Sequence, residues 1–187
     1  MAKSKQKIFE AARELFAKHG YKETTTARIA ERSGFSEAAI YKHYRNKQAL
    51  LESIVNPIQD KYVYYMSERR PGETAGLDCL LNLVEYHEHF LRRNTDEVHV
   101  LLSSYPYVPG LRARMDAWIG LLEDYVTLCV RAGQQDGSVR ADLDPDTTVN
   151  TLVMMLFGMA RVLIHLPDKS QVGGNVYAFC KTALRRE

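Results

Sequence analysis

The chain has 187 residues, 45% of them hydrophobic and 26% charged, which is enough for an apolar core in one domain or in two small ones. Its start, MAKSKQKIFEAARELF, lacks the unbroken apolar stretch of a secretory signal, so we expect a soluble cytoplasmic protein. The cysteines Cys79, Cys129 and Cys180 form no CxxC pair, which argues against a disulfide framework and a zinc cluster and predicts that they fill core space.

Positive charge is concentrated at the N-terminal end of the chain. Residues 1–49 contain 11 Lys and Arg against 5 Asp and Glu, a net charge of +6, whereas residues 50–187 have a net charge of −4. A basic segment joined to a mildly acidic one predicts that the first contacts a polyanion and the second does not.

The first predicted helix has one apolar stripe. Ile8, Ala12, Leu15 and Phe16 follow the i, i+4, i+7, i+8 spacing of an amphipathic helix. We expect this helix to end at Gly20.

Two short helices joined by a tight turn are predicted in TTARIAERSGFSEAAIYKHYRNK, residues 25–47. Thr24 or Thr25 can cap the first helix, which stops near Ser33. Gly34 can adopt the left-handed conformation that a sharp exit requires, and Ser36 can cap the second helix, which runs to about residue 44.

Helical spacing continues to the end of the chain, with no alternating strand pattern. Asn46 is expected to cap a fourth helix, which Pro57 should kink or break. Asp144 is expected to cap a later helix that has Pro145 at its first position, after a loop over 133–146. The remaining helices are predicted at about 75–93, 97–104, 111–132, 146–166 and 174–186, with turns at 69–76 and 105–110.

Ala30, Gly34 and Ile40 indicate what the two short helices do. Helices that cross steeply need a small residue where their backbones approach, a glycine in the turn and a branched apolar residue facing the core. These three positions supply those residues, so the pattern predicts a helix-turn-helix motif.

The second helix of such a motif enters the major groove, while neighbouring helix ends point hydroxyl and amide groups at phosphates. The groove-facing candidates are small, basic or acidic: Glu37, Ala38, Ala39, Lys42 and His43. The phosphate candidates are Thr25, Thr26, Ser36, Tyr41, Tyr44 and Lys47, and Arg28 can reach either bases or phosphates.

The run GYKETTTARIAERSGFSEAAIYKHYRNKQALL, residues 20–51, resembles the tetracycline-repressor (TetR) family of bacterial transcription regulators. The resemblance implies a three-helix DNA-binding domain over 1–47 and a helical effector-binding and dimerisation domain over 48–187. It makes Ser36 the cap and phosphate ligand of the recognition helix, Tyr41 and Tyr44 backbone contacts or packing residues, and Lys47 a phosphate contact. Glu37 departs from the family pattern, because an acid there repels phosphate unless it accepts a hydrogen bond from a cytosine amino group.

Residues 149–166 form an unusually apolar helix, with 13 of 18 positions Val, Leu, Met, Phe, Ala or Ile. Asn150, Arg161 and His165 interrupt a stretch already short for a membrane span, so we expect no membrane insertion. A helix that is apolar on most faces predicts a homodimer, formed through 146–166 and 174–186.

Aromatic and sulfur side chains are concentrated in the middle of the chain, where the resemblance implies a small-molecule effector. We predict an apolar, partly aromatic effector that contacts some or all of Tyr62, Tyr65, Tyr86, Phe90, Tyr105, Trp118, Tyr125, Met155 and Phe157, with core packing as the alternative role of each.

No metal, cofactor or catalytic site is predicted. His87 and His89 are two residues apart and therefore face nearly opposite sides of a helix. The sequence contains no GxSxG, HExxH or phosphate-binding glycine loop. We therefore expect a ligand-responsive regulator, most simply a repressor on a palindromic double-stranded DNA operator. The alternatives are a DNA-binding dimer without an effector and a helical enzyme that does not bind DNA.

Overall fold

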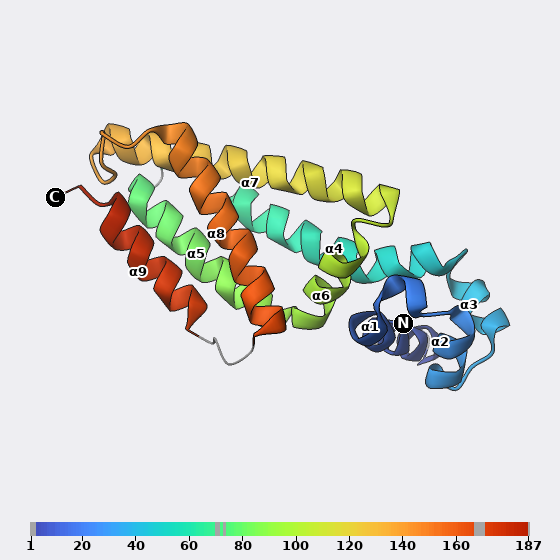
Figure 1. Cartoon of the computed structure of the whole chain (residues 1–187). Helices are drawn as coiled ribbons and strands as arrows, with labels where there is room; N and C mark the ends of the chain where they lie inside the picture. The colour runs from blue at the N-terminus through green and yellow to red at the C-terminus, as the bar shows by residue number, and fades with distance from the viewer. Residues whose placement is uncertain (1–2, 70–71, 73, 167–170, 187) are drawn as a thin grey trace. The chain divides into compact units, whose positions relative to one another are not determined.

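The computed structural model describes residues 3–69, 72, 74–166 and 171–186. Within these ranges the regular elements are all α-helices, so the predicted all-α class is confirmed (Figure 1). The helices are α1 (Lys3–Glu23), α2 (Thr26–Ser33), α3 (Glu37–His43), α4 (Lys47–Glu68), α5 (Gly76–Arg93), α6 (Thr95–Ser104), α7 (Pro109–Asp136), α8 (Pro145–His165) and α9 (Val172–Leu184).

The helices form two compact units. The first comprises Met1–Lys61 and Asp96–Asp116, and the second comprises Tyr62–Thr95 and Ala117–Glu187. Helices α4 and α7 therefore each begin in the first unit and end in the second. The boundary predicted after residue 47 concerns where the DNA-binding segment ends, and it stays a prediction.

The core of the first unit begins with the apolar stripe of α1. Ile8, Ala12 and Phe16 are fully buried, as are Ile29 of α2 and Ile40 of α3. The three helices contact one another pairwise, so the stripe predicted from spacing is the surface on which the two short helices pack.

Gly20 interrupts the first helix, as predicted, because its φ of 77° and ψ of 164° are not helical. A further helical turn after this kink carries α1 on to Glu23. Pro57 does not break the fourth helix, because α4 runs on to Glu68, and a kink at this position stays a prediction. Proline removes one backbone hydrogen bond, and the burial of Ile54 and Ile58 on either side of it holds the helix together.

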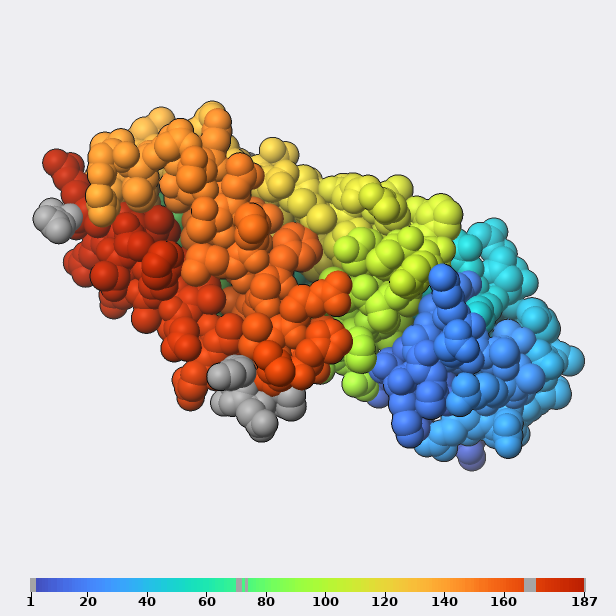
Figure 2. All heavy atoms as spheres, in the orientation of Figure 1, coloured from blue at the N-terminus to red at the C-terminus, as the bar shows by residue number. Residues whose placement is uncertain are grey.

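In the second unit α5 packs against α8 and α9, which also contact each other. Figure 2 shows α8 in orange and α9 in red side by side on one face. Helix α5 buries Leu80, Leu83 and Val84, and α7 buries Val126 and Val130.

Helix α7 is longer than the sequence predicted. The expected loop began at Gly133, since glycine usually ends a helix, but α7 continues to Asp136. Gly133 lies against α5: a Cβ atom on Gly133 would be 3.3 Å from the Leu77 nitrogen and closer still to the side chain of Val139. The glycine therefore serves a close helix contact and does not end the helix.

Helix α8 begins as predicted, and its composition is the most apolar of the long helices. The Asp144 carboxylate accepts a hydrogen bond from the Thr147 nitrogen at 2.8 Å, and Pro145 stands in the first turn. By length and a mean hydropathy of 1.6, α8 is also a candidate membrane span, with 39% of that window buried inside the protein. The core helix of a soluble protein passes the same test, so this is weak support for a span.

Candidate nucleic-acid interface and aromatic cluster

Both short helices are capped by the residues that the sequence indicated. The Thr25 hydroxyl accepts from the Arg28 nitrogen at 3.2 Å, and the Ser36 hydroxyl accepts from the Ala39 nitrogen at 3.3 Å. Gly34 has φ 74° and ψ 27°, the left-handed conformation that a tight turn requires. These contacts confirm the predicted helix, turn and helix.

The residues predicted to contact DNA differ widely in exposure. Tyr44 is buried, whereas four of them, Thr26, Ala39, His43 and Lys47, are half-buried. The remainder are exposed and lie on α2, on α3 or at their caps: Thr25, Arg28, Ser36, Glu37, Ala38, Tyr41 and Lys42. The exposed positions of the two short helices therefore offer hydroxyls, a guanidinium and an ammonium to a ligand.

Glu37 has a partner that the sequence did not reveal. The Thr26 hydroxyl donates to Glu37 Oε2 at 2.5 Å, and the Tyr41 hydroxyl lies 3.4 Å from the same Thr26 oxygen. One hydrogen bond thus connects the first turns of α2 and α3 and fixes the direction of the carboxylate. Residues 26 and 37 are eleven apart, so sequence spacing alone offered no signal for this contact.

Lys47 is tied to the backbone between α1 and α2. Its Nζ donates to the carbonyl oxygens of Tyr21 and Thr24, at 2.8 and 2.9 Å, and lies 4.2 Å from the centroid of the Tyr21 ring. Burial lowers the pKa of this ammonium. Since lysine has three N–H donors, two are used here and one is left for another partner. The predicted phosphate contact of Lys47 stays a prediction.

His43 and Tyr44, at the end of α3, also contact α1. The Ser4 hydroxyl is 2.9 Å from His43 Nε2, and the Lys5 ammonium is 5.8 Å from the centroid of the Tyr44 ring. Between the two roles considered for Tyr44, its burial favours packing. The next residue, Arg45, is exposed and was not among the predicted contacts, although a cation directly after the recognition helix was a usable signal.

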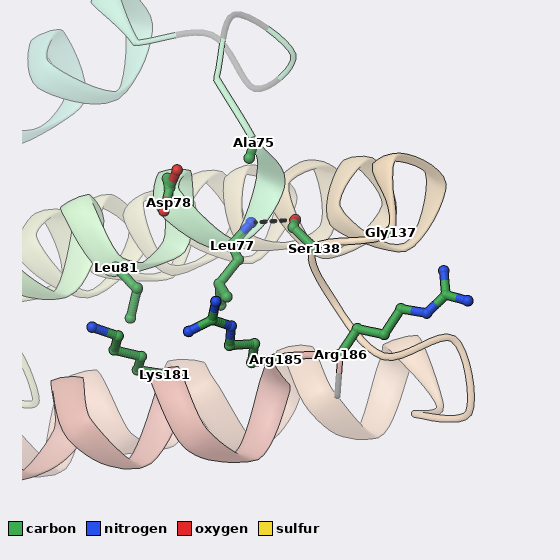
Figure 3. Close-up of a pocket in the computed structure, with 9 residues that line it drawn as sticks. All are labelled: Ala75, Leu77, Asp78, Leu81, Gly137, Ser138, Lys181, Arg185 and Arg186. Carbon is green, nitrogen blue, oxygen red and sulfur yellow. Dashed lines mark hydrogen bonds between the residues drawn. The ribbon is translucent and has the colours of Figure 1, made fainter.

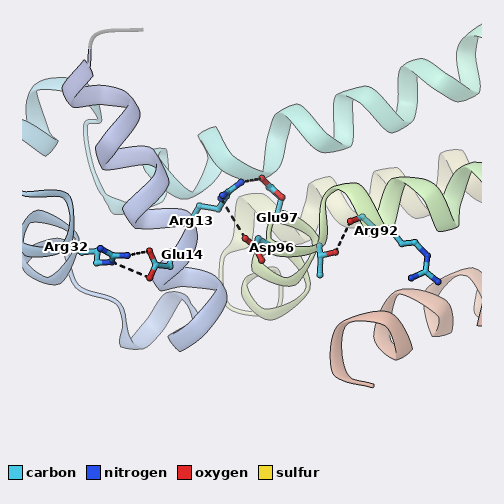
Figure 4. Close-up of polar contacts among 7 residues, drawn as sticks. Arg13, Glu14, Arg32, Arg92, Asp96 and Glu97 are labelled. Carbon is cyan, nitrogen blue, oxygen red and sulfur yellow. Dashed lines mark hydrogen bonds and ion pairs between the residues drawn. The ribbon is translucent and has the colours of Figure 1, made fainter. Parts of the chain in front are cut away.

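The segment 96–116 is attached to the N-terminal helices within the first unit. Arg13 Nη1 donates to Glu97 at 3.0 Å, and Arg13 Nε is 4.0 Å from Asp96 (Figure 4). The Lys22 ammonium lies 3.8 Å from the centroid of the Tyr107 ring. These contacts join α6 and the segment after it to α1.

In the second unit, aromatic rings surround Tyr62, which is fully buried. Its ring centroid is 5.4 Å from that of Tyr86, 4.9 Å from that of Phe90 and 5.1 Å from that of Trp118. The ring of Tyr65 stacks on that of Tyr86 with centroids 3.4 Å apart. We call these five residues the ring cluster.

His87 stands beside the ring cluster with both nitrogens hydrogen-bonded. Its Nε2 lies 2.9 Å from the Leu156 carbonyl oxygen, and its Nδ1 lies 2.7 Å from the Tyr62 hydroxyl. A carbonyl only accepts, so the ring proton is on Nε2, and Nδ1 accepts from the tyrosine. Burial lowers the pKa of His87 to about 4, which keeps the imidazole neutral at pH 7.

The other predicted effector residues do not join the ring cluster. Tyr125 lies beside Cys79 instead, with its hydroxyl 3.3 Å from Cys79 Sγ. Tyr105 belongs to the first unit, and Met155 and Phe157 are half-buried on α8. Within the cluster, the buried Trp118 Nε1 has no hydrogen-bond partner among the described residues.

A cleft of about 390 Å³ opens elsewhere in the second unit, near the start of α5 (Figure 3). Cations of α9 and of the residues after it line one side, and the Ser138 hydroxyl on the other side accepts from the Leu77 nitrogen at 3.1 Å. The sequence did not predict it. Its lining residues are Ala75, Leu77, Asp78, Leu81, Gly137, Ser138, Lys181, Arg185 and Arg186.

Comparison with known proteins agrees with this geometry. The family model "Bacterial regulatory proteins, tetR family" matches residues 8–54, which span the helix-turn-helix. The chain is 24% identical over 188 residues to the HTH-type transcriptional regulator TtgR of Pseudomonas putida, covering 97% of this chain and 90% of that one. It is 25% identical over 150 residues to the HTH-type transcriptional repressor KstR2 of Rhodococcus jostii, covering 73% and 68%.

Solved structures share the fold over nearly the whole chain. PfmR, a TetR-family regulator of Thermus thermophilus, superposes with a TM-score of 0.78 at 23% identity, covering 96% of both chains. FadR of Bacillus subtilis, solved in complex with stearoyl-CoA, superposes with a TM-score of 0.71 at 17% identity, covering 96% of this chain and 99% of that one.

A helix-turn-helix with an exposed polar face, joined to a larger helical unit, defines a DNA-binding transcriptional regulator. The chain belongs to the TetR family of such regulators, as its matching segment and its relatives show. These relatives are regulators and not enzymes.

Proposed function

We propose that the chain is a cytoplasmic, ligand-responsive repressor that binds a palindromic operator as a homodimer and leaves it when an effector binds. The observation that carries this proposal is the exposed polar face of α2 and α3 above a buried three-helix core. The similarity to KstR2, which is a transcriptional repressor, supports the direction of regulation. Residues 1–47 are the proposed DNA-binding domain, and residues 48–187 bind the effector and dimerise.

In this proposal the recognition helix α3 reads bases through Ala38, Ala39 and Lys42. The alanines are small enough for contact with thymine methyl groups, and lysine donates to guanine or phosphate. The phosphate contacts are Thr25, Ser36 and Arg45, with Arg28 reaching phosphates or bases and Tyr41 extending the same exposed face.

Dimerisation is proposed through α8 and α9. The largest exposed apolar side chains on and beside these helices are Met154, 73% exposed, and Leu166 and Phe179, each 52% exposed. An isologous contact between two copies would cover them and relate the two α3 helices by a two-fold axis. The operator is then a near-palindrome with half-sites roughly 34–36 Å apart.

The effector is proposed to bind at the ring cluster. The unpaired Trp118 Nε1 is a buried donor in an apolar surrounding, which suits a mostly apolar ligand with one acceptor atom. The stearoyl-CoA complex of FadR supports a ligand site in this fold. The Arg13–Glu97 ion pair is the proposed link by which a shift of α6 reaches α1. A coupling of about 1–3 kcal/mol is typical of such linkage.

Selection of bound duplexes from a random library tests the DNA-binding part of the proposal. The expected product is an inverted repeat with half-site centres about one helical turn apart, and its affinity should fall steeply with salt. Lys42→Ala should weaken operator binding, whereas Lys181→Ala, which removes the same charge from the second unit, should leave it unchanged. An unstructured set of selected sequences, or equal effects of the two variants, contradicts the proposal.

A screen of lipophilic compounds for loss of operator affinity tests the effector part. Any active compound should bind Trp118→Phe more weakly than the parent, because that variant keeps an aromatic ring but lacks the Nε1 donor. If no compound lowers operator affinity, the alternative of a DNA-binding dimer without effector is favoured. The fully buried Tyr62 at the centre of the ring cluster supports that alternative.

A further inference from the structure

Two of the three cysteines meet in the second unit, beside Tyr125. Cys79 of α5 and Cys129 of α7 are free and buried, and their Sγ atoms are 2.8 Å apart. The prediction that the cysteines fill core space is confirmed by their burial, but it did not foresee this pair. Fifty residues separate the two positions in sequence, so no local spacing could reveal it.

The pair is brought together by a close crossing of α5 and α7. Gly76 and Gly133 face each other where the helices approach, and a Cβ atom on Gly76 would lie 2.5 Å from the Cys129 carbonyl oxygen. Cys79 and Cys129 stand about one helical turn from these glycines, on the same side of the crossing. The absence of a Cβ atom on Gly76 permits this approach of the two helices.

Two hydrogen bonds from the start of α5 to the end of α7 and the loop after it stabilise this crossing. The Gly76 nitrogen donates to Asp136 Oδ2 at 2.8 Å, and the Leu77 nitrogen donates to Ser138 Oγ at 3.1 Å. The start of α5 is thereby bound to the end of α7. A disulfide has an S–S length of about 2.05 Å, so the two sulfurs need to approach by less than about 1 Å to form one.

Tyr125 also contacts the cysteine pair. Its hydroxyl is 3.3 Å from Cys79 Sγ, so Cys79 has two potential donors, the Cys129 thiol and the tyrosine. The hydrogen bond from Cys129 is the main reason why the pKa of Cys79 falls to about 7, and the Tyr125 hydroxyl lowers it further against the effect of burial. The same contact with Cys79 raises the pKa of Cys129. Because Cys79 has two potential hydrogen-bond donors, the geometry favours it as the thiolate of the pair, with Cys129 as the partner thiol.

We propose that Cys79 and Cys129 form a redox-active dithiol, which a small hydroperoxide oxidises to a reversible disulfide between α5 and α7. The Cys79 thiolate attacks the terminal peroxide oxygen, the O–O bond breaks, and the leaving alkoxide or hydroxide takes from solvent the equivalent of the proton that Cys79 released. The product at Cys79 is a sulfenic acid. The Cys129 sulfur then attacks the sulfenic sulfur, the S–S bond forms, and the S–OH oxygen leaves as water with the thiol proton. Two thiols lose two electrons and the peroxide gains them.

The disulfide fixes helices that also carry the ring cluster. Phe90 lies on α5 and Trp118 on α7, so a bond between these helices restricts any rearrangement that opens the cluster. This consequence for the effector rests on the proposed function. The oxidation itself needs neither DNA nor effector, so its failure and the failure of the proposed function are distinguishable.

The test is oxidation of the reduced, full-length protein by hydrogen peroxide under native conditions. The expected result is a loss of two hydrogen atoms in intact mass and a fall from three titratable thiols to one. A tryptic digest should contain a peptide joining residues 79 and 129, with Cys180 still a free thiol. A thiol reductant should reverse all three changes. The oxidised protein should melt roughly 5 °C or more above the reduced one, because the bond closes a long loop.

Variants separate the roles of the two cysteines. Cys129→Ser should accumulate a sulfenic acid at Cys79 that a 1,3-diketone traps, and Cys180→Ser should form the disulfide as the parent does. Three thiols that persist in peroxide, a bond that includes Cys180, or a bond only between chains would overturn the proposal. Should a variant fail to fold, the peptide map of the parent protein decides the matter alone.

Discussion

Glu37 places a negative charge on the otherwise basic face that we propose binds DNA. Five of the 11 cations of the first 49 residues lie within ten positions of it in sequence, and an acid among cations weakens attraction to phosphate. The Thr26 hydroxyl donates to its carboxylate at 2.5 Å, which keeps the acid at the start of α3 in one orientation. In the proposed interface this residue lowers the affinity for phosphate and offers a fixed hydrogen-bond acceptor at the start of the recognition helix.

Glu37→Gln keeps an acceptor for Thr26 while removing the charge. We expect this variant to bind nonspecific duplex roughly two- to tenfold more tightly at low salt, with reduced discrimination between operator and random sequence. Titration of labelled duplexes at two salt concentrations measures both effects. Asp124→Asn, which removes an exposed charge from α7 in the second unit, is the control and should change neither. Unchanged nonspecific affinity of Glu37→Gln would show that this acid does not face the phosphates.

His87 makes the stability of the second unit depend on pH. Its pKa is about 4 in the folded protein and 6.5 when exposed, so the unfolded chain binds the proton more readily. Stability is therefore complete above pH 6.5 and is lost as the pH falls toward 4. The free energy of unfolding should decrease by about 2 kcal/mol between pH 7.5 and pH 5 from this group.

Denaturant titrations at the two pH values measure that decrease. His87→Gln should be less stable at pH 7.5 but should lose the pH dependence of this group. The exposed His89 offers a matched control, and His89→Gln should keep the dependence of the parent. An unaltered pH dependence in His87→Gln would contradict the assignment of His87 as the buried neutral imidazole.

At the scale of elements, sequence patterns predicted local features well and long-range contacts poorly. The caps Thr25, Ser36 and Asp144 and the left-handed Gly34 were identifiable because each acts within four residues of itself. Gly133 was misinterpreted as the end of a helix, because its close contact with α5 comes from a distant part of the chain.

In the candidate site, too, local features could be predicted from the sequence and contacts between helices could not. The exposed positions of α2 and α3 follow from helical periodicity, whereas the Thr26–Glu37 hydrogen bond and the two backbone partners of Lys47 depend on how the helices pack. Composition identified the aromatic residues of the second unit but could not tell that Tyr125 lies beside Cys79.

The glycines of α7 give a direct test of the close helix crossing. Gly133→Ala places a methyl group against Val139 and the backbone of Leu77, so we expect a loss of about 1–3 kcal/mol in the free energy of unfolding. Gly120→Ala, on the same helix, meets nothing within 4 Å and should stabilise the protein by up to about 1 kcal/mol. Denaturant titration of the reduced proteins compares the two. Equal effects of the two variants would contradict a contact specific to residue 133.

For the whole molecule, the proposed regulation requires a path between the effector-binding and DNA-binding parts of the chain. Helices α4 and α7 each contribute to both units, so a change in the second unit has a covalent path to the first. The exposed apolar side chains of α8 and α9 lie in the second unit, whereas the proposed DNA-binding face lies in the first. Dimerisation and DNA binding are thus assigned to separate units and can be perturbed separately.

Met154→Lys tests that separation, because it places a charge at the most exposed apolar side chain of α8. Burial of that charge in a dimer contact is unfavourable, so we expect a folded monomer at micromolar concentration, measured by sedimentation. Operator affinity should fall roughly tenfold or more, since one protein no longer holds two half-sites. Leu128→Lys, at a 56% exposed apolar residue of α7, is the matched control and should remain dimeric. A monomeric Met154→Lys protein that binds the palindrome as tightly as the parent would show that the two half-sites are not read by a preformed dimer.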